Sequence, residues 1–148
     1  MTKEHIQSLD EMAAILEDSG YHVAEGDQFL AVKVPNPGHE PKNALLTIDE
    51  IRNKLIVSCR VARYGDVREE RLAAFQAALL DANTRIDPFA FATITDQDDP
   101  DIGDESDWVV VLISSMPLGD LSPDELNTAM ADLANALPIA QEVLEAIA

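Results

Sequence analysis

Hydrophobic residues recur along the chain with two different spacings, which predict helices and strands in turn. Residues 4–18 have helical spacing, with an apolar stripe made of Ile6, Leu9, Met12, Ala13 and Leu16. Gly20 is expected to end this helix, because glycine readily adopts the left-handed conformation of a helix C-terminus. Residues 28–34, QFLAVKV, alternate with period two and predict a strand. One face of that strand carries Leu30, Val32 and Val34, and the other carries Phe29, Ala31 and Lys33.

Two further strands are predicted at residues 44–48 and 55–61, after a proline-rich loop at residues 35–43. The polar segment DEIRNK, residues 49–54, joins them as a hairpin in which Asn53 can take a positive φ. In the second of these strands an apolar set alternates with a mixed set: Leu55, Val57, Cys59 and Val61 against Ile56, Ser58 and Arg60. The alternation predicts a sheet with one face more buried than the other.

A second helix is predicted at residues 67–83, with an apolar stripe made of Leu72, Phe75, Leu79 and Ala82. Asp66 is expected to cap this helix, with Glu69 reaching back to the cap. Strands follow at residues 89–94 and 108–114. The last of them is apolar on both faces, which predicts a central strand or one covered on both sides.

The start of the last helix is predicted by several local signals. They are an N-cap at Ser122, a proline at the first helical position, a capping box completed by Glu125, and a hydrophobic staple between Leu121 and Leu126. Pro138 is expected to kink or restart the helix. The predicted order is therefore α-β-β-β-α-β-β-α, an α+β fold with a mainly antiparallel five-stranded sheet and helices packed against it. Residues 1–148 are expected to form one domain, because the chain has the length of one and holds no long linker.

The charge of the chain bears on the class of ligand that it can bind. Its 28 acidic and 10 basic residues give a net charge of −18. No Lys or Arg follows Arg85, while residues 86–148 hold 14 acidic residues. A field of this sign opposes phosphate binding, so nucleic acid is a poor ligand, and basic proteins are attracted. No apolar run is long enough for a membrane span and the N-terminus lacks a signal sequence. With a single cysteine, Cys59, these features predict a cytoplasmic protein.

Candidate catalytic and metal-binding groups are few. Residues 96–107, DQDDPDIGDESD, hold seven carboxylates, but the glycine does not stand at the sixth position that a calcium loop requires. This loop is either a solvated connection or a weak site for a hard cation or a basic partner. His5, His22 and His39 lack metal-ligand spacing, and Ser114 and Ser115 lack a nucleophile turn. No catalytic residue, cofactor or metal is therefore assigned, and the protein is not expected to be an enzyme.

The segments ALLDANTRIDPFAFATI, residues 78–94, and SSMPLGDLSPDEL, residues 114–126, resemble the YbjN-like domain, whose fold is that of the type III secretion chaperones. The resemblance extends over nearly the whole chain and its motifs carry no catalytic content. It implies a small acidic homodimer that holds an extended or partly unfolded segment of another protein. The long acidic loop at residues 96–107 departs from the family pattern.

Two functions are considered. In the first, a chaperone-like module binds a segment of a partner protein through Phe29, Ala31, Lys33 and Arg60. The small side chains of the second helix predict its dimer contact, at Ala74, Phe75, Ala78 and Leu79. The alternative is an acidic regulator, or nucleic-acid mimic, that binds a basic protein surface.

Overall fold

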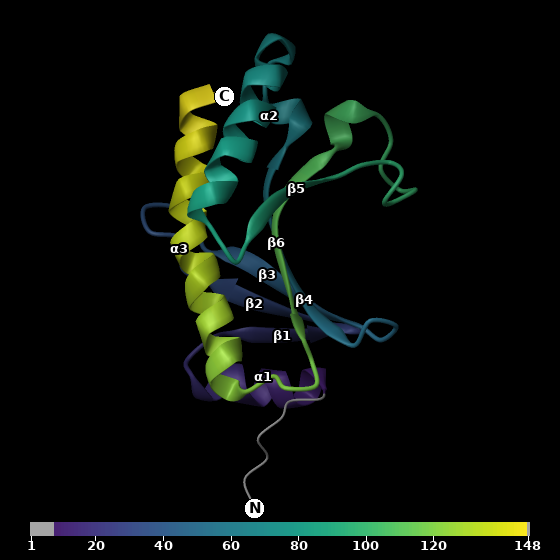
Figure 1. Ribbon diagram of the computed structural model, residues 1–148, viewed down its shortest axis with the longest axis vertical. Helices are drawn as coiled ribbons and strands as arrows, with labels where there is room; N and C mark the ends of the chain where they lie inside the picture. The colour runs from purple at the N-terminus through teal and green to yellow at the C-terminus, as the bar shows by residue number, and fades with distance from the viewer. Residues whose placement is uncertain (1–7, 148) are drawn as a thin grey trace, which may run out of the picture.

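A computed structural model describes residues 8–147 and consists of one open sheet with helices along one side (Figure 1). The elements are α1 (Leu9–Asp18), β1 (Val23–Gly26), β2 (Phe29–Val34), β3 (Lys42–Asp49), β4 (Lys54–Arg63), α2 (Leu72–Ala82), β5 (Ala90–Ile94), β6 (Val109–Pro117) and α3 (Pro123–Ile147). The strand order is β1-β2-β3-β4-β6-β5, and every neighbouring pair is antiparallel. The α+β class and the antiparallel sheet are confirmed.

The sheet has six strands, and the prediction of five is wrong. The missed strand, β1, pairs with β2 from Val23 opposite Val32 to Gly26 opposite Phe29. Only Asp27 and Gln28 separate the two strands, and Gln28 has a φ of 64°. The sequence signal is weak because β1 is four residues long, ends in Glu-Gly and is mostly exposed, so it shows no apolar alternation.

Helix α1 begins after Ser8, whose hydroxyl accepts a hydrogen bond of 3.2 Å from the backbone N–H of Glu11. Residues 4–7 of the predicted helix, Ile6 included, lie outside the described residues. The helix ends as predicted at Gly20, which has a φ of 96°. Tyr21 donates to the carbonyl of Leu16 across this glycine, which completes a Schellman motif.

Helix α2 begins later than the predicted residue 67, and Asp66 does not cap it. A 3₁₀ turn at Tyr64–Asp66 comes first, and Val67 is then extended and buried. A second 3₁₀ turn at Glu69–Arg71 leads into the helix, where no side chain caps the first turn. Because the buried Val67 is extended, the helix cannot begin directly after Asp66. Asp66 therefore does not lie at the N-terminus of α2, although the local sequence has the pattern of a capping box.

Helix α3 begins where it was predicted to begin. The Ser122 hydroxyl accepts a hydrogen bond of 3.2 Å from the N–H of Glu125, and the Glu125 carboxylate lies 3.2 Å from that hydroxyl. The predicted restart at Pro138 does not occur, because one helix runs through it to Ile147. Pro138 lies on the exposed side of α3, where water can satisfy the carbonyl that loses its donor.

The helices bury one face of the sheet. The main core joins α1 and α3 to the inner side chains of β2, β3, β4 and β6, including Leu30, Leu46, Val57 and Leu112. A second core joins α2 to the end of α3 and to Val110 of β6. In Figure 1, α3 runs along the sheet, α2 lies beside its C-terminal half, and α1 lies near its N-terminal end. Within residues 8–147, no α-helix lies on the opposite face of the sheet.

Candidate functional site

The face of the sheet that points away from the helices is a candidate functional site. Cross-strand pairing aligns the side chains of this outer face, so that Ala31 of β2, Leu45 of β3, Ser58 of β4 and Ile113 of β6 form one row. Beside this row, Lys33 of β2 pairs with Asn43 of β3, and Arg60 of β4 pairs with Val111 of β6. The loop between β5 and β6 and the turn between β3 and β4 both project away from α3 (Figure 1).

These strands line a concavity of about 540 Å³ on the outer face. Its lining is Ala31, Pro41, Lys42, Asn43, Leu45, Ser58, Arg60, Ile94, Val111 and Ile113. Leu45 is 38% exposed, an unusual value for a leucine in an inner strand of a sheet. The surface therefore combines apolar side chains of β2, β3, β5 and β6 with Ser58 and Arg60 of β4 and with Lys42 at its border.

A bulge in β4 shapes the end of this surface. Arg60 pairs with Val111 and Ala62 pairs with Val110, so Val61 has no partner opposite it. A bulge of this kind bends a strand and increases its twist. Arg60 keeps its place on the outer face, whereas Val61 and Ala62 pack against the second core.

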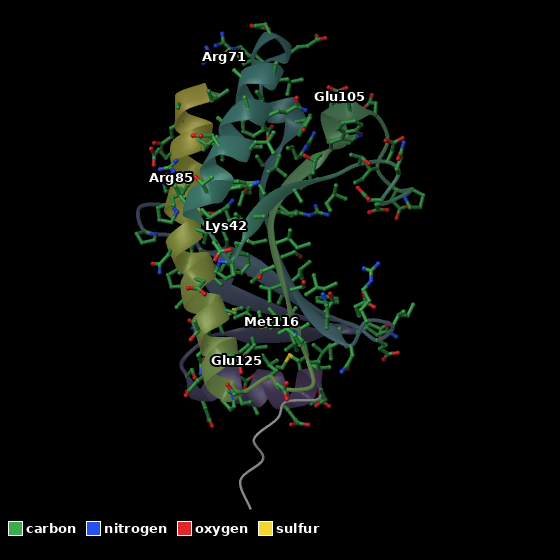
Figure 2. The ribbon with its side chains drawn as sticks, in the orientation of Figure 1. Lys42, Arg71, Arg85, Glu105, Met116 and Glu125 are labelled. Atoms are coloured by element: carbon green, nitrogen blue, oxygen red, sulfur yellow. The ribbon has the colours of Figure 1, made fainter. Side chains whose placement is uncertain are left out.

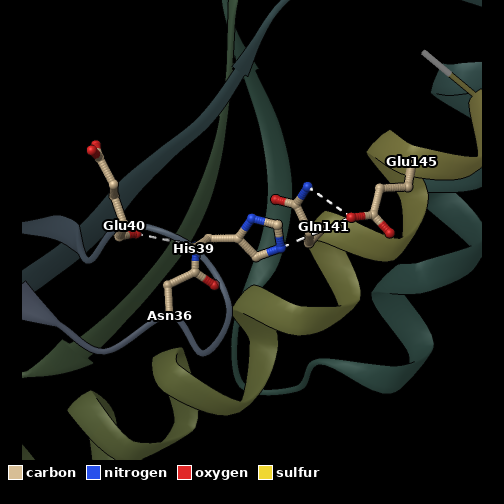
Figure 3. Close-up of polar contacts among 5 residues, drawn as sticks. All are labelled: Asn36, His39, Glu40, Gln141 and Glu145. Atoms are coloured by element: carbon tan, nitrogen blue, oxygen red, sulfur yellow. Dashed lines mark hydrogen bonds and ion pairs between the residues drawn. The ribbon is translucent and has the colours of Figure 1, made fainter.

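The rim of the concavity is held in place by the loop before β3. Asn36 is buried and donates to the carbonyl of Glu40 at 3.4 Å, and the N–H of His39 donates to the carbonyl of Asn36 at 2.9 Å. Nε2 of His39 lies 3.9 Å from a carboxylate oxygen of Glu145 on α3, which also accepts a bond from Gln141 (Figure 3). These contacts tie the loop to α3 and so position Pro41 and Lys42.

Two of the four predicted partner-binding residues, Ala31 and Arg60, line the concavity. Phe29 and Lys33 share the outer face of β2 with Ala31, and Phe29 is 37% exposed. Sequence reasoning did not find Leu45, Ile94, Val111 and Ile113 as members of this surface. Only the alternation within each strand could have indicated them, and it does not show which strands become neighbours.

The predicted dimer residues are divided between the surface and the interior. Phe75 is fully buried and Leu79 is 7% exposed, and both belong to the second core of their own chain. Ala78 is half-buried and Ala74 is exposed. The large apolar side chain on the exposed side of α2 is Leu80, which is 70% exposed.

A smaller hollow of about 360 Å³ lies between α2 and β5. Leu80, Asn83 and Phe91 are among its lining residues. Across it runs a hydrogen-bonded chain in which Gln76 donates to the Tyr64 hydroxyl at 2.9 Å and that hydroxyl lies 3.2 Å from the Thr93 hydroxyl. These two contacts link α2 to β5 through the Tyr64 hydroxyl.

Reactive and ligating groups are dispersed. Within residues 8–147, no cluster of three or more His, Cys, Asp or Glu side chains is placed to hold a metal ion. In the acidic loop, Asp98 accepts a bond of 3.0 Å from the N–H of Thr95, and Asp99 one of 3.0 Å from that of Asp101. Burial raises the pKa of Cys59 to about 11, which keeps the thiol protonated, and Lys42 opposes the rise. No helix among the described residues is long and apolar enough to span a membrane.

The sequence matches no family model and no curated protein. Solved structures are similar: YbjN, a candidate transcription regulator from E. coli, aligns with a TM-score of 0.59 and 16% identity over 90% of this chain and 94% of its own. The HopA1-SchA chaperone-effector complex contains a chain that aligns with a TM-score of 0.53 and 16% identity over 90% of each chain. The chain therefore has a YbjN-like fold, of the kind also found in a chaperone-effector complex.

Proposed function

We propose that this protein is a non-enzymatic, chaperone-like module that holds an extended or partly unfolded segment of a partner protein on the outer face of its sheet. The observation that carries the proposal is the concavity between β2 and β5, where Leu45 is exposed and Ile113 is half-buried. An extended segment has side chains on alternating sides, so one side can fill such a surface while the other faces water.

The fold supports the proposal without deciding it, because one fold serves many functions. A chain of similar fold belongs to a complex described as chaperone and effector.

The protein is also proposed to be a homodimer in which the exposed side of α2 contacts its copy. Ala73, Ala74 and Ala77 leave that side smooth around the exposed Leu80, so that two helices can approach closely. This contact uses the residues beside Phe75 and Leu79 and leaves those two in the core.

A matched pair of substitutions tests the binding function. Leu45→Glu places a charge in the concavity, whereas Ile51→Glu changes the 97% exposed residue at the tip of the β3–β4 turn. Binding of a short fluorescent peptide rich in Leu and Val is measured by anisotropy at physiological ionic strength. Leu45→Glu is expected to weaken binding at least about tenfold, because a buried apolar contact is worth more than 1 kcal/mol.

Ile51→Glu is expected to bind the peptide as well as the unsubstituted protein does. Equal binding by both variants would contradict the proposal. The acidic-regulator alternative gives the opposite salt response: a charge-driven complex weakens steeply as ionic strength rises, while an apolar one changes little.

A further inference from the structure

Cations are concentrated on three neighbouring strands of a chain that is otherwise strongly acidic, and two of them, Lys42 and Arg60, line the concavity. Five of the ten Lys and Arg residues lie on β2, β3 and β4: Lys33, Lys42, Lys54, Arg60 and Arg63. Arg71 and Arg85 lie on the helical side of the molecule, where each contacts α3, and Figure 2 shows Lys42 beside α3 as well. With a net charge of −18, this local excess of positive charge needs an explanation.

The described residues that line the concavity include Lys42 and Arg60, and none of them is a carboxylate. Among residues 8–147, Arg63 pairs with Asp107 at 3.7 Å and Arg52 with Asp49 at 3.7 Å, but no carboxylate lies within ion-pair distance of Arg60 or Lys42. The one acidic side chain on the outer face of β3, Asp49, lies at the far end of the strand. Its carboxylate is occupied by Arg52 and by the N–H groups of Ile51 and Arg52.

From this distribution we infer that the segment bound in the concavity is acidic, an extended stretch in which Asp or Glu side chains stand next to apolar ones. The inference rests on the proposed function and names the chemistry of the partner segment. Apolar side chains of such a segment contact Leu45, Ile94 and Ile113, and a carboxylate beside them meets Arg60. The guanidinium group of Arg60 can bind a carboxylate through two parallel hydrogen bonds. A lysine-rich segment has no carboxylate to accept them.

A single-stranded nucleic acid is the other anionic polymer that an open sheet can bind. Binding of that kind depends on bases stacking on aromatic side chains, and no Phe, Tyr or Trp lines the concavity. The net charge of the chain repels a polyphosphate and an acidic peptide alike, so the lining of the concavity is what separates the two. An acidic peptide with apolar side chains fits that apolar lining and the cations Lys42 and Arg60 within it.

Three synthetic peptides with the same alternating Leu and Val residues test this inference. The polar positions hold Glu in the first, Gln in the second and Lys in the third, and anisotropy measures the affinity of each for the full chain. The Glu peptide is expected to bind about five- to tenfold more tightly than the Gln peptide, and the Lys peptide most weakly. This expected order of affinities is a demanding test, because the negative charge of the whole chain by itself attracts the Lys peptide.

Arg60→Gln is expected to bring the affinity of the Glu peptide within about twofold of that of the Gln peptide, whose own affinity stays unchanged. The matched control, Arg68→Gln, removes an exposed arginine that lies outside the concavity and is expected to leave the ranking as it was. Circular dichroism verifies that both variants fold.

Each adverse outcome has its own meaning. Equal affinity of the three peptides, or tightest binding of the Lys peptide, overturns the acidic preference while the binding function stands. Absence of binding by all three contradicts the binding function itself. Displacement of the Glu peptide by an oligothymidylate overturns the inference and assigns the surface to nucleic acid.

Discussion

The side-chain oxygen of Asn83 accepts a hydrogen bond of 2.7 Å from the backbone N–H of Phe91. Asn83 follows directly on α2, and Phe91 lies on β5, which is an edge strand of the sheet. Edge strands leave backbone donors unpaired, so they invite pairing with other chains. The bond between Asn83 and Phe91 covers one of these donors and joins the end of α2 to the sheet.

Asn83→Ala is expected to lower the free energy of unfolding by about 1–2 kcal/mol, because a half-buried N–H loses its acceptor. Urea denaturation measures the change. Thr84→Ala is the control, since the Thr84 hydroxyl bonds the carbonyl of Asp81 at the exposed surface, and it is expected to cost less than about 0.5 kcal/mol. Equal decreases in the free energy of unfolding of the two variants would show that the bond to Phe91 stabilises the fold no more than the exposed bond of Thr84 does.

The elements that could be predicted from sequence are those whose signals are local. The start of α3 depends on residues 121–126, which cap and staple one another, and the alternation in β2 separates the buried Leu30 from the exposed Phe29. The later start of α2 depends on burial of Val67 by distant residues, which no local pattern reports.

The candidate site could be predicted only in part, for a related reason. Alternation identified Ala31 and Arg60 as outer-face residues, but Leu45, Ser58 and Ile113 become one row only through the strand order β2-β3-β4-β6. Helical periodicity likewise placed Phe75 and Leu79 on one stripe of α2. It could not tell a stripe that faces the core from one that faces a second copy.

Leu80→Glu tests the proposed dimer contact. The leucine is 70% exposed, so the charge is expected to leave the fold intact and to prevent two α2 helices from packing. Light scattering after size-exclusion chromatography is expected to give the mass of one chain, where the unsubstituted protein gives two. Phe75→Ala, by contrast, is expected to cost about 3–5 kcal/mol of stability, because its side chain is fully buried. A dimeric Leu80→Glu variant would contradict the contact.

The buried thiol of Cys59 is expected to make the free energy of unfolding depend on pH in the alkaline range. Burial raises its pKa from 9.0 to about 11, so the folded state holds the proton more tightly than the unfolded state. The contribution to stability is complete below pH 9 and is lost as the pH rises through about 11. The unsubstituted protein is expected to lose on the order of 2 kcal/mol more than Cys59→Ala across this window. Urea denaturation at a series of pH values measures the free energy of unfolding of both proteins. The same pH dependence in the two would exclude ionisation of Cys59 as its cause.

The acidic loop between β5 and β6 is expected to oppose the binding of acidic segments, because it begins beside Ile94, which lines the concavity. Deleting residues 97–105 removes five carboxylates, those of Asp98, Asp99, Asp101, Asp104 and Glu105. The Glu peptide is then expected to bind about two- to threefold more tightly at low ionic strength, with less gain at high salt, where charges are screened. Replacing Asp98, Asp99 and Asp101 by Asn keeps the loop length and the oxygen that accepts from Thr95, so it separates charge from shape. Tighter binding of the Lys peptide than of the Glu peptide by the full chain, lost on this deletion, would instead favour the acidic loop as the binding element and the basic-partner alternative over the concavity.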